Sequence, residues 1–190
     1  MRALLWLIGL MALIIIGAVL IFGGNKKPAP TSTGPVILPL ADYASTDATV
    51  SMTIDGVVNG DDAHRAIRIT VGRDQRVLDI VQGYSDHVIE RHAFYNTEDA
   101  YNVFLRSING GGFLLKNKSK NVPSSPTGQC PLENRYIFNL DQGADTLSSL
   151  WTSDCGTKTG SFSGSLEIMQ RLFENQITDY NDLVSQVRLN

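Results

Sequence analysis

The sequence predicts an α+β fold, in which an antiparallel β-meander sheet is packed by two main helices and preceded by one N-terminal transmembrane helix. Three observations lead to this prediction. The chain opens with a long uncharged apolar run. Segments of alternating apolar and polar residues follow, separated by turn residues. Helical spacing appears only after these strands, and strands grouped before helices argue against a doubly wound parallel sheet.

The apolar run extends from Ala3 to Gly24 and carries no charge. At about 1.5 Å per residue, a helix of this length spans the core of a bilayer. A cleaved secretory signal is an alternative, but the bulky residues 19–22 at the end of the run suit a small-x-small cleavage site poorly. No cysteine follows the run for lipid modification. We therefore expect residues 1–24 to form a transmembrane signal anchor, with residues 3–24 in the membrane.

The flanking charges do not decide the orientation of this span, because Arg2 and the amino terminus oppose Lys26 and Lys27. Two other features place the N-terminus in the cytoplasm. A head of two residues is the ordinary form of an uncleaved signal anchor. Cys130 and Cys155 suit a disulfide, which needs an oxidising compartment. The expected location is the cell membrane, as a single-pass protein with an extracytoplasmic C-terminal domain.

Proline divides the remainder of the chain. Four of the seven prolines lie between residues 28 and 39, and the other three lie between residues 123 and 131. Because proline is excluded from helix interiors and central strands, regular structure is expected in 40–122 and 132–190. Residues 25–45 are predicted to form a Pro/Thr/Ser-rich stalk. Residues 46–190 are enough for one extracytoplasmic α+β domain.

Alternating residues predict the strands of the sheet. In the first strand, odd-numbered polar residues such as Thr53 share one face, and even-numbered apolar residues such as Ile54 share the other. This pattern is typical of a half-buried strand. Three such strands are expected over residues 48–58, 64–72 and 76–82, and an extended run over 87–95, whose alternation is mixed, completes a four-stranded meander.

The dipeptide Asn59-Gly60 predicts a hairpin with a two-residue turn after the first strand. Inward residues are even-numbered before this turn and odd-numbered after it. A connecting loop with an even number of residues keeps both sets on one face of the sheet. Ile54 and Ile67 are therefore expected to point inward, whereas His64 and Arg68 are expected to point outward.

Helical spacing begins after Asn96, where a capping side chain and early acids precede apolar residues, and it predicts a helix over 97–109 on the apolar face of the sheet. Gly110-Gly111-Gly112 ends this helix. A second main helix, opened by Ser163 or Ser165, is expected over 164–176, followed by a short helical turn from Thr178. Between the two helices we expect a polar loop over 116–134 and short strands over 113–115, 135–141 and 147–153.

No stretch has a catalytic, cofactor-binding or metal-binding signature, so we assign no such residue and expect no cofactor. His87 and His92 lie on opposite faces of a strand, and no cysteine is near enough to complete a zinc site. Glu90 and His92 share a face and can pair. The stretch 59–62 lacks the ligand spacing of a calcium loop.

Charge excludes one class of partner. The chain has 16 Lys+Arg against 19 Asp+Glu, and a mildly acidic domain has no electrostatic footprint for nucleic acid. Basic residues do gather at Lys116, Lys118 and Lys120. They suit a patch for anions or lipid headgroups, or else a solvated loop.

The only residues to which we assign a role are Cys130 and Cys155, as a disulfide. They flank the predicted strand 135–141 and the segment around Trp151. The bond would close a loop of about 26 residues, for which the chain-entropy model gives roughly 3–3.5 kcal/mol. Two unrelated thiols in a cytoplasmic domain are the alternative.

The layout of the chain resembles uncharacterised single-span extracytoplasmic proteins of small-genome bacteria. Such proteins carry no established activity, so the resemblance implies a location and no site residues. The features that carry it are the anchor with its Pro/Thr stalk, Gly83-Tyr84, Arg135-Tyr136-Ile137-Phe138, Leu150-Trp151 through Cys155, and Leu172-Phe173 through Gln176-Ile177-Thr178-Asp179-Tyr180.

A tether, a stalk and a domain without a catalytic constellation favour binding as the function, with another envelope protein or a wall or surface component as partner. The alternatives are an envelope hydrolase whose site the sequence does not reveal, and a structural spacer. An enzyme is the less favoured class. An exposed apolar or aromatic patch would favour binding. A concave site with convergent polar groups and a shifted histidine or carboxylate pKa would favour the hydrolase.

Overall fold

The computed structural model describes residues 37–155 and 160–189. The expected membrane anchor, residues 1–24, lies outside the described residues, as do residues 25–36 of the expected stalk. Within the two described stretches, no helix combines the length and apolar character that a membrane crossing requires. The first described element is the 3-10 helix η1 (Leu40–Tyr43), and both of its end residues are buried in the core of the domain.

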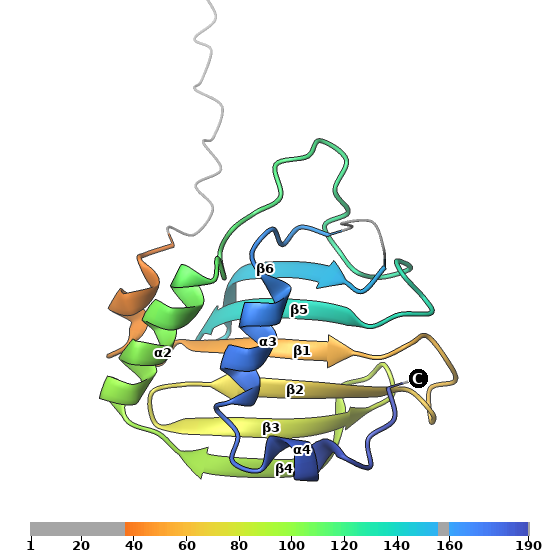
Figure 1. Cartoon of the computed structure of the whole chain (residues 1–190), viewed down its shortest axis with the longest axis horizontal. Coiled ribbons are helices and arrows are strands. Elements are labelled where there is room, and N and C mark those ends of the chain that lie inside the picture. The colour runs from red at the N-terminus through yellow and green to blue at the C-terminus, as the bar shows by residue number, and fades with distance from the viewer. Residues whose placement is uncertain (1–36, 156–159, 190) are drawn as a thin grey trace, which may run out of the picture. The chain divides into compact units, whose positions relative to one another are not determined.

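A six-stranded antiparallel sheet in the order β4-β3-β2-β1-β5-β6 forms the body of the domain (Figure 1). The first four strands make the predicted meander. The fifth strand pairs with the free side of β1, and the sixth pairs with the fifth. The strands are β1 (Thr49–Asp55), β2 (Arg65–Val71), β3 (Gln75–Gln82), β4 (His87–Tyr95), β5 (Arg135–Gln142) and β6 (Asp145–Ser153).

The helices α2 (Glu98–Gly110), α3 (Leu166–Glu174) and α4 (Tyr180–Val184) lie against one face of this sheet (Figure 1). The two longer helices begin where polar caps were expected. The Thr97 side chain accepts a hydrogen bond from the backbone N–H of Ala100, and Ser165 does the same for Ile168. These bonds satisfy backbone donors that the first helical turn leaves unpaired. The α+β class is confirmed.

The core lies between the sheet and the helices. Ile54 pairs with Ile67 across β1 and β2, and their exposed fractions are 5% and 4%. The parity argument for the inward face is therefore confirmed. Phenylalanine rings fill the space above these strands, and Phe104 on α2 meets Phe173 on α3 edge to face, with ring centroids 5.2 Å apart. Such contacts add to the burial of the rings themselves.

The prediction of a two-residue turn at Asn59-Gly60 is wrong. β1 ends at Asp55 and β2 begins at Arg65, so a longer loop, residues 56–64, joins them. The backbone N–H groups that would have extended β1 are taken by distant partners instead. Val57 donates to the carbonyl of Leu189 at 2.8 Å, and Val58 donates to that of Pro131 at 2.7 Å. The longer loop keeps the inward residues of both strands on one face of the sheet, because the register sets Asp55 opposite Ala66.

The strand predicted over 113–115 is also wrong. The chain turns there, and the N–H of Leu115 donates to the carbonyl of Gly112 at 2.8 Å. Gly112 has a φ of +87°, which suits glycine and reverses the chain directly after α2. Phe113 is buried in the core, so its apolar character reflects helix-side packing rather than a strand.

Candidate functional site

The most deeply buried polar cluster joins the ends of three strands. His64, directly before β2, lies with its Nε2 2.8 Å from Oδ1 of Asp55 at the end of β1. Arg135, the first residue of β5, donates from Nε to Oδ2 of the same carboxylate at 2.8 Å and from Nη2 to the carbonyl of Gly56. His64 and Arg135 are 2% and 3% exposed. His64 was expected on the outward face, where it meets Asp55, but it is buried there rather than exposed to solvent.

The surroundings of His64 explain its burial. Its Nδ1 lies 3.1 Å from the carbonyl of Val57, so each ring nitrogen faces an oxygen acceptor. Tyr84 covers the ring, with centroids 4.1 Å apart, and its hydroxyl donates to the carbonyl of Asn59. The cluster fixes the loop 56–64 against the sheet. The polar groups of His64, Asp55 and Arg135 bond to one another and to nearby backbone carbonyls, so we interpret the cluster as structural.

The histidines of β4 form no larger site. Nε2 of His92 lies 2.6 Å from Oε1 of Glu90, which confirms that the two share a face of the strand. His87 lies elsewhere, at a hollow that Asp61 and Asp86 also line. Among the described residues, no group of three or more histidine, cysteine, aspartate or glutamate side chains is placed to hold a metal ion.

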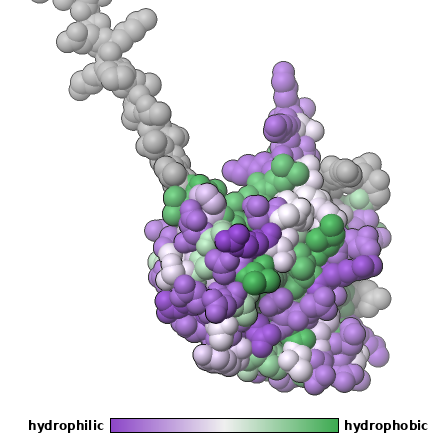
Figure 2. Space-filling view, turned by 60° about the vertical axis from the view of Figure 1, so that its left-hand side comes forward, coloured by the Kyte–Doolittle hydropathy of each residue, from purple (hydrophilic) through white to green (hydrophobic). Residues whose placement is uncertain are grey.

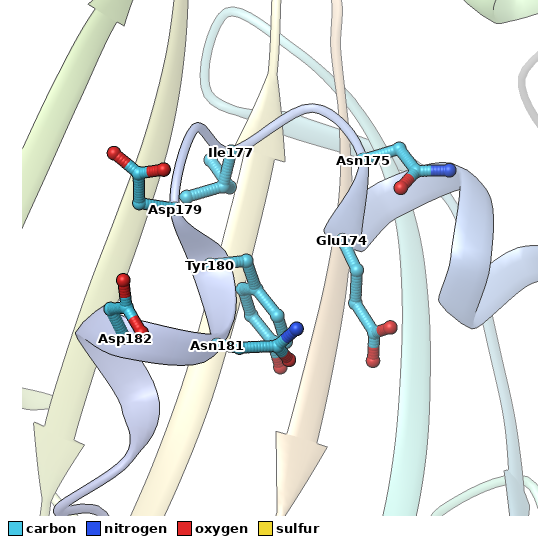
Figure 3. Close-up of a pocket in the computed structure, with 7 residues that line it drawn as sticks. All are labelled: Glu174, Asn175, Ile177, Asp179, Tyr180, Asn181 and Asp182. Carbon is cyan, nitrogen blue, oxygen red and sulfur yellow. The ribbon is translucent and has the colours of Figure 1, made fainter.

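A polar hollow of about 350 Å³ lies where α3 leads into α4 (Figure 3). Glu174 lies on one side of the Tyr180 ring, and Asp179 and Asp182 lie on the other. Burial raises the pKa of the Glu174 carboxyl above its usual value. Burial, with a smaller contribution from the charge of Glu174, also raises the pKa of Tyr180. The lining residues are Glu174, Asn175, Ile177, Asp179, Tyr180, Asn181 and Asp182.

This hollow has the concave, polar setting and the shifted carboxylate pKa that would favour a hydrolase. Glu174 has a shifted pKa in a concave setting, so it stays protonated to a higher pH than an ordinary glutamate. The residues that line the hollow include no histidine, cysteine or basic side chain. The hollow thus combines Glu174 with two further carboxylates, Asp179 and Asp182, but has no basic side chain to stabilise negative charge.

An ionic cluster crosses the sheet face that turns away from the helices. Asp79 on β3 is 3% exposed and accepts from Arg91 at 2.6 and 2.9 Å and from Arg68 at 3.2 Å. Burial raises the pKa of the Asp79 carboxyl, but the hydrogen bonds from Arg91 and Arg68 outweigh it and hold the pKa below the usual value. The sequence showed these charges as ordinary surface residues. Their grouping follows from the strand register, which sets Arg68 and Arg91 on either side of Asp79.

The predicted disulfide partners lie together at the base of the loop 116–134. The Cα atoms of Cys130 and Cys155 are 6.0 Å apart, within the range of a disulfide. The loop has a second attachment, because Nε1 of Trp151 donates to the carbonyl of Pro123 at 2.9 Å. Trp151 is 1% exposed as a result. The loop is therefore held at two points while residues 118–121 remain exposed.

The two edges of the sheet differ in cover. Along β6, the N–H of Phe162 donates to the carbonyl of Trp151 at 2.9 Å, and the N–H of Trp151 donates to Oγ of Ser161 at 3.1 Å. Along the outer side of β4, the only backbone hydrogen bond among the described residues comes from the side chain of Arg76, whose Nη2 donates to the carbonyl of Tyr95 at 3.0 Å.

A search of protein-family models and of curated protein sequences finds no match to this chain.

Proposed function

We propose that this chain is a membrane-anchored extracytoplasmic binding domain, tethered through residues 3–24, which holds another envelope protein or a wall or surface component. The observation that supports this function best is residues 116–132 of the loop 116–134. Lys116, Lys118 and Lys120 are all exposed, and the first acidic residue of the loop is Glu133. In a chain of net charge −3, this segment is a local reversal of charge.

The three lysines are available to a partner. None of them makes an ion pair with any residue in 37–155 or 160–189. Figure 2 shows the loop as a predominantly hydrophilic projection from the domain. Its base is fixed by Cys130 and Trp151, so the exposed part is presented from a rigid scaffold, as binding loops commonly are.

Apolar side chains adjoin the base of the loop. Leu132 is 80% exposed and Val58 is 47% exposed, and their segments touch through the bond from Val58 to Pro131. Exposed apolar side chains rimmed by polar residues mark protein-binding surfaces. The partner that fits is an anionic one, either the acidic surface of an envelope protein or an anionic wall component.

The test is photo-crosslinking in intact cells from a photoreactive residue at Ser119 in the full chain. We expect a discrete crosslinked product whose yield falls about tenfold when Lys116, Lys118 and Lys120 are changed to serine, since three surface charge pairs contribute roughly 1–2 kcal/mol together. The control changes Arg106, Arg171 and Arg188 to serine and removes the same charge elsewhere. A photoreactive residue at Val103 on α2 reports nonspecific contact.

Two outcomes would overturn the binding function of this loop. One is the absence of any product from Ser119. The other is a product that the control variant weakens as much as the lysine variant does, because net charge and not the loop would then be responsible.

The alternative of an envelope hydrolase draws on Glu174 alone. If that carboxyl were a catalytic acid, Glu174→Gln would abolish an activity and leave the crosslink from Ser119 unchanged. The binding function requires the reverse, with the crosslink lost in the lysine variant and kept in Glu174→Gln.

A further inference from the structure

The backbone of β4 offers a regular set of unpaired groups. The N–H of Asn96 donates to the carbonyl of Asp74 at 2.9 Å, and Tyr95 stands opposite Gln75 in the register. In an antiparallel pair, residues that bond to the neighbouring strand alternate with residues whose N–H and C=O point away from it. Arg91, Ala93 and Tyr95 therefore direct their backbone groups outward, toward solvent.

Nothing in the side chains of this stretch blocks another strand. β4 contains no proline, and its outward residues are exposed, with Tyr95 at 79%. Proteins usually blunt such an edge with proline, charged side chains, a short strand, a bulge or cover from another segment. Here the register shifts between Ile80 and Val81, which leaves Ile89 as an extra residue on β4 and bends the strand before Arg91. The bend limits any added pairing to residues 91–95.

The three outward residues are spaced evenly about Ala93. We propose that β4 pairs with β4 of a second copy of this chain, antiparallel about a two-fold axis at Ala93, so that the two sheets join into one. In this register Ala93 stands opposite Ala93, and Arg91 stands opposite Tyr95 in both directions. Every outward N–H of one copy then meets an outward C=O of the other.

The side chains fit the same register. Alanine at the two-fold axis leaves room for the close approach of two strands. Asp79 holds the Arg91 guanidinium with two hydrogen bonds, and this fixed cation lies beside the Tyr95 ring of the second copy, which favours a cation–π contact. A register centred on Arg91 instead would set two guanidinium groups opposite each other, and like charges in that position destabilise a sheet.

The Tyr95 carbonyl already accepts one bond from Arg76, but a carbonyl oxygen has a second lone pair for the new strand. At the other edge of the sheet, Ser161 and Phe162 occupy the outer backbone groups of Trp151. Pairing of β4 with β4 about a two-fold axis uses the same edge of both copies, so it closes as a dimer. This surface is separate from the loop 116–132, so the dimer does not depend on the binding function proposed for that loop.

Two measurements on the full chain in detergent test the dimer. In the first, Ala93→Cys adds a thiol on the two-fold axis, where opposed Cα atoms are about 5.5 Å apart and close enough for a disulfide. We expect an intermolecular disulfide to form under mild oxidation at least about tenfold faster than in Val103→Cys, whose thiol lies on the exposed face of α2. Equal rates would overturn the proposal.

In the second measurement, the mass of the complex is followed by light scattering against protein concentration. Tyr95→Lys sets a cation against Arg91 of the second copy twice per dimer, and it should weaken association about tenfold. Thr146→Lys adds the same charge to the β6 edge and should not change association. Ala93→Pro should abolish the dimer, because it removes an outward N–H that makes no bond within the chain.

A chain that is monomeric at micromolar concentration, or a dimer that survives both Tyr95→Lys and Ala93→Pro, would overturn the inference. The second result would assign self-association to another part of the chain. Should Ala93→Pro fail to fold, the crosslinking of Ala93→Cys and the effect of Tyr95→Lys decide the question alone.

Discussion

The two edge strands of the sheet, β6 and β4, differ in how their outer backbone groups are hydrogen-bonded. β6 is covered at Trp151 by Ser161 and Phe162, and the indole Nε1 of Trp151 donates to the carbonyl of Pro123. β4 follows β3 through a tight turn and has one side-chain bond to its outer backbone. Long-range contacts thus close one edge, and the other edge keeps its hydrogen-bonding groups for a partner. The difference teaches that contacts from other segments of the chain, and not the sequence of the strand itself, decide which edge of this sheet is open to another strand.

The largest effect should come from a change that destroys both edges at once. Ile67→Lys places a charge in the core between sheet and helices, where it has no partner, and should cost roughly 3–5 kcal/mol of unfolding free energy. Thr53→Ala, on the opposite face of the neighbouring strand, is the control and should cost less than about 1 kcal/mol. Urea denaturation followed by circular dichroism measures both. Equal losses would show that the two faces are buried alike.

The disulfide should matter to the covered edge alone. Cys155→Ser, or reduction of the native chain, should lower the unfolding free energy by roughly 3–3.5 kcal/mol, because the bond closes a loop of about 26 residues. Amide exchange should increase in the loop 116–134 and in β6 and stay unchanged in β4. Reduction of a Cys130→Ser/Cys155→Ser double variant is the control and should have no effect. Faster exchange in β4 would mean that the two edges are coupled.

Gly160→Ala tests the cover itself. A Cβ atom on Gly160 would lie 2.3 Å from the carbonyl oxygen of Trp151, and the backbone φ of +138° suits glycine alone. We expect a loss of roughly 2 kcal/mol and an exposed β6 edge. Gly128→Ala is the control, since it carries a φ of +73° with nothing within 4 Å of the added atom. A difference between the two in thermal unfolding isolates the contact with Trp151, and no difference would remove that contact from the account.

The smallest effect concerns the ionic cluster beside the open edge. The pKa of Asp79 is lowered in the folded state, so its contribution to stability is present above the unfolded pKa and is lost as pH falls through the folded value. Asp79→Asn should therefore cost about 1–2 kcal/mol at neutral pH and flatten the decline in stability below about pH 4. Asp74→Asn, at an exposed carboxylate paired only with its neighbour Arg73, is the control. An identical pH profile for Asp79→Asn and the wild type would contradict this sign.

Much of the fold was open to prediction because it follows from local chemistry. Alternation set the inward face of β1 and β2, and the caps Thr97 and Ser165 set the starts of the two main helices. The Cys130–Cys155 pair was predicted from the composition of the chain and its flanking segments. Each of these features depends on residues that are near in sequence or on a residue type with one strong preference.

The polar clusters were not open to prediction in the same way. Arg135 meets Asp55 across 80 positions of the chain, and Arg91 meets Asp79 only once the β3–β4 register is set. Each residue taken singly has the pattern of a solvated strand end. His64 belongs to this group, since its burial depends on Tyr84, which the β3–β4 turn brings over the ring.

The sequence by itself determined the order of strands and helices, the face of the sheet that the apolar side chains occupy, and the expectation of a membrane anchor. Only the tertiary structure decided where each backbone group finds its partner. Asn59-Gly60 favours a tight turn locally, but the carbonyls of Leu189 and Pro131 take the N–H groups of Val57 and Val58 and open the loop. In the same way, the fold brings residues 161 and 162 to the outer backbone of β6 and brings no backbone segment to the outer side of β4 among the described residues. A buried or paired backbone group gains its hydrogen bond from whichever partner the whole fold brings near, and sequence neighbours do not reveal that partner.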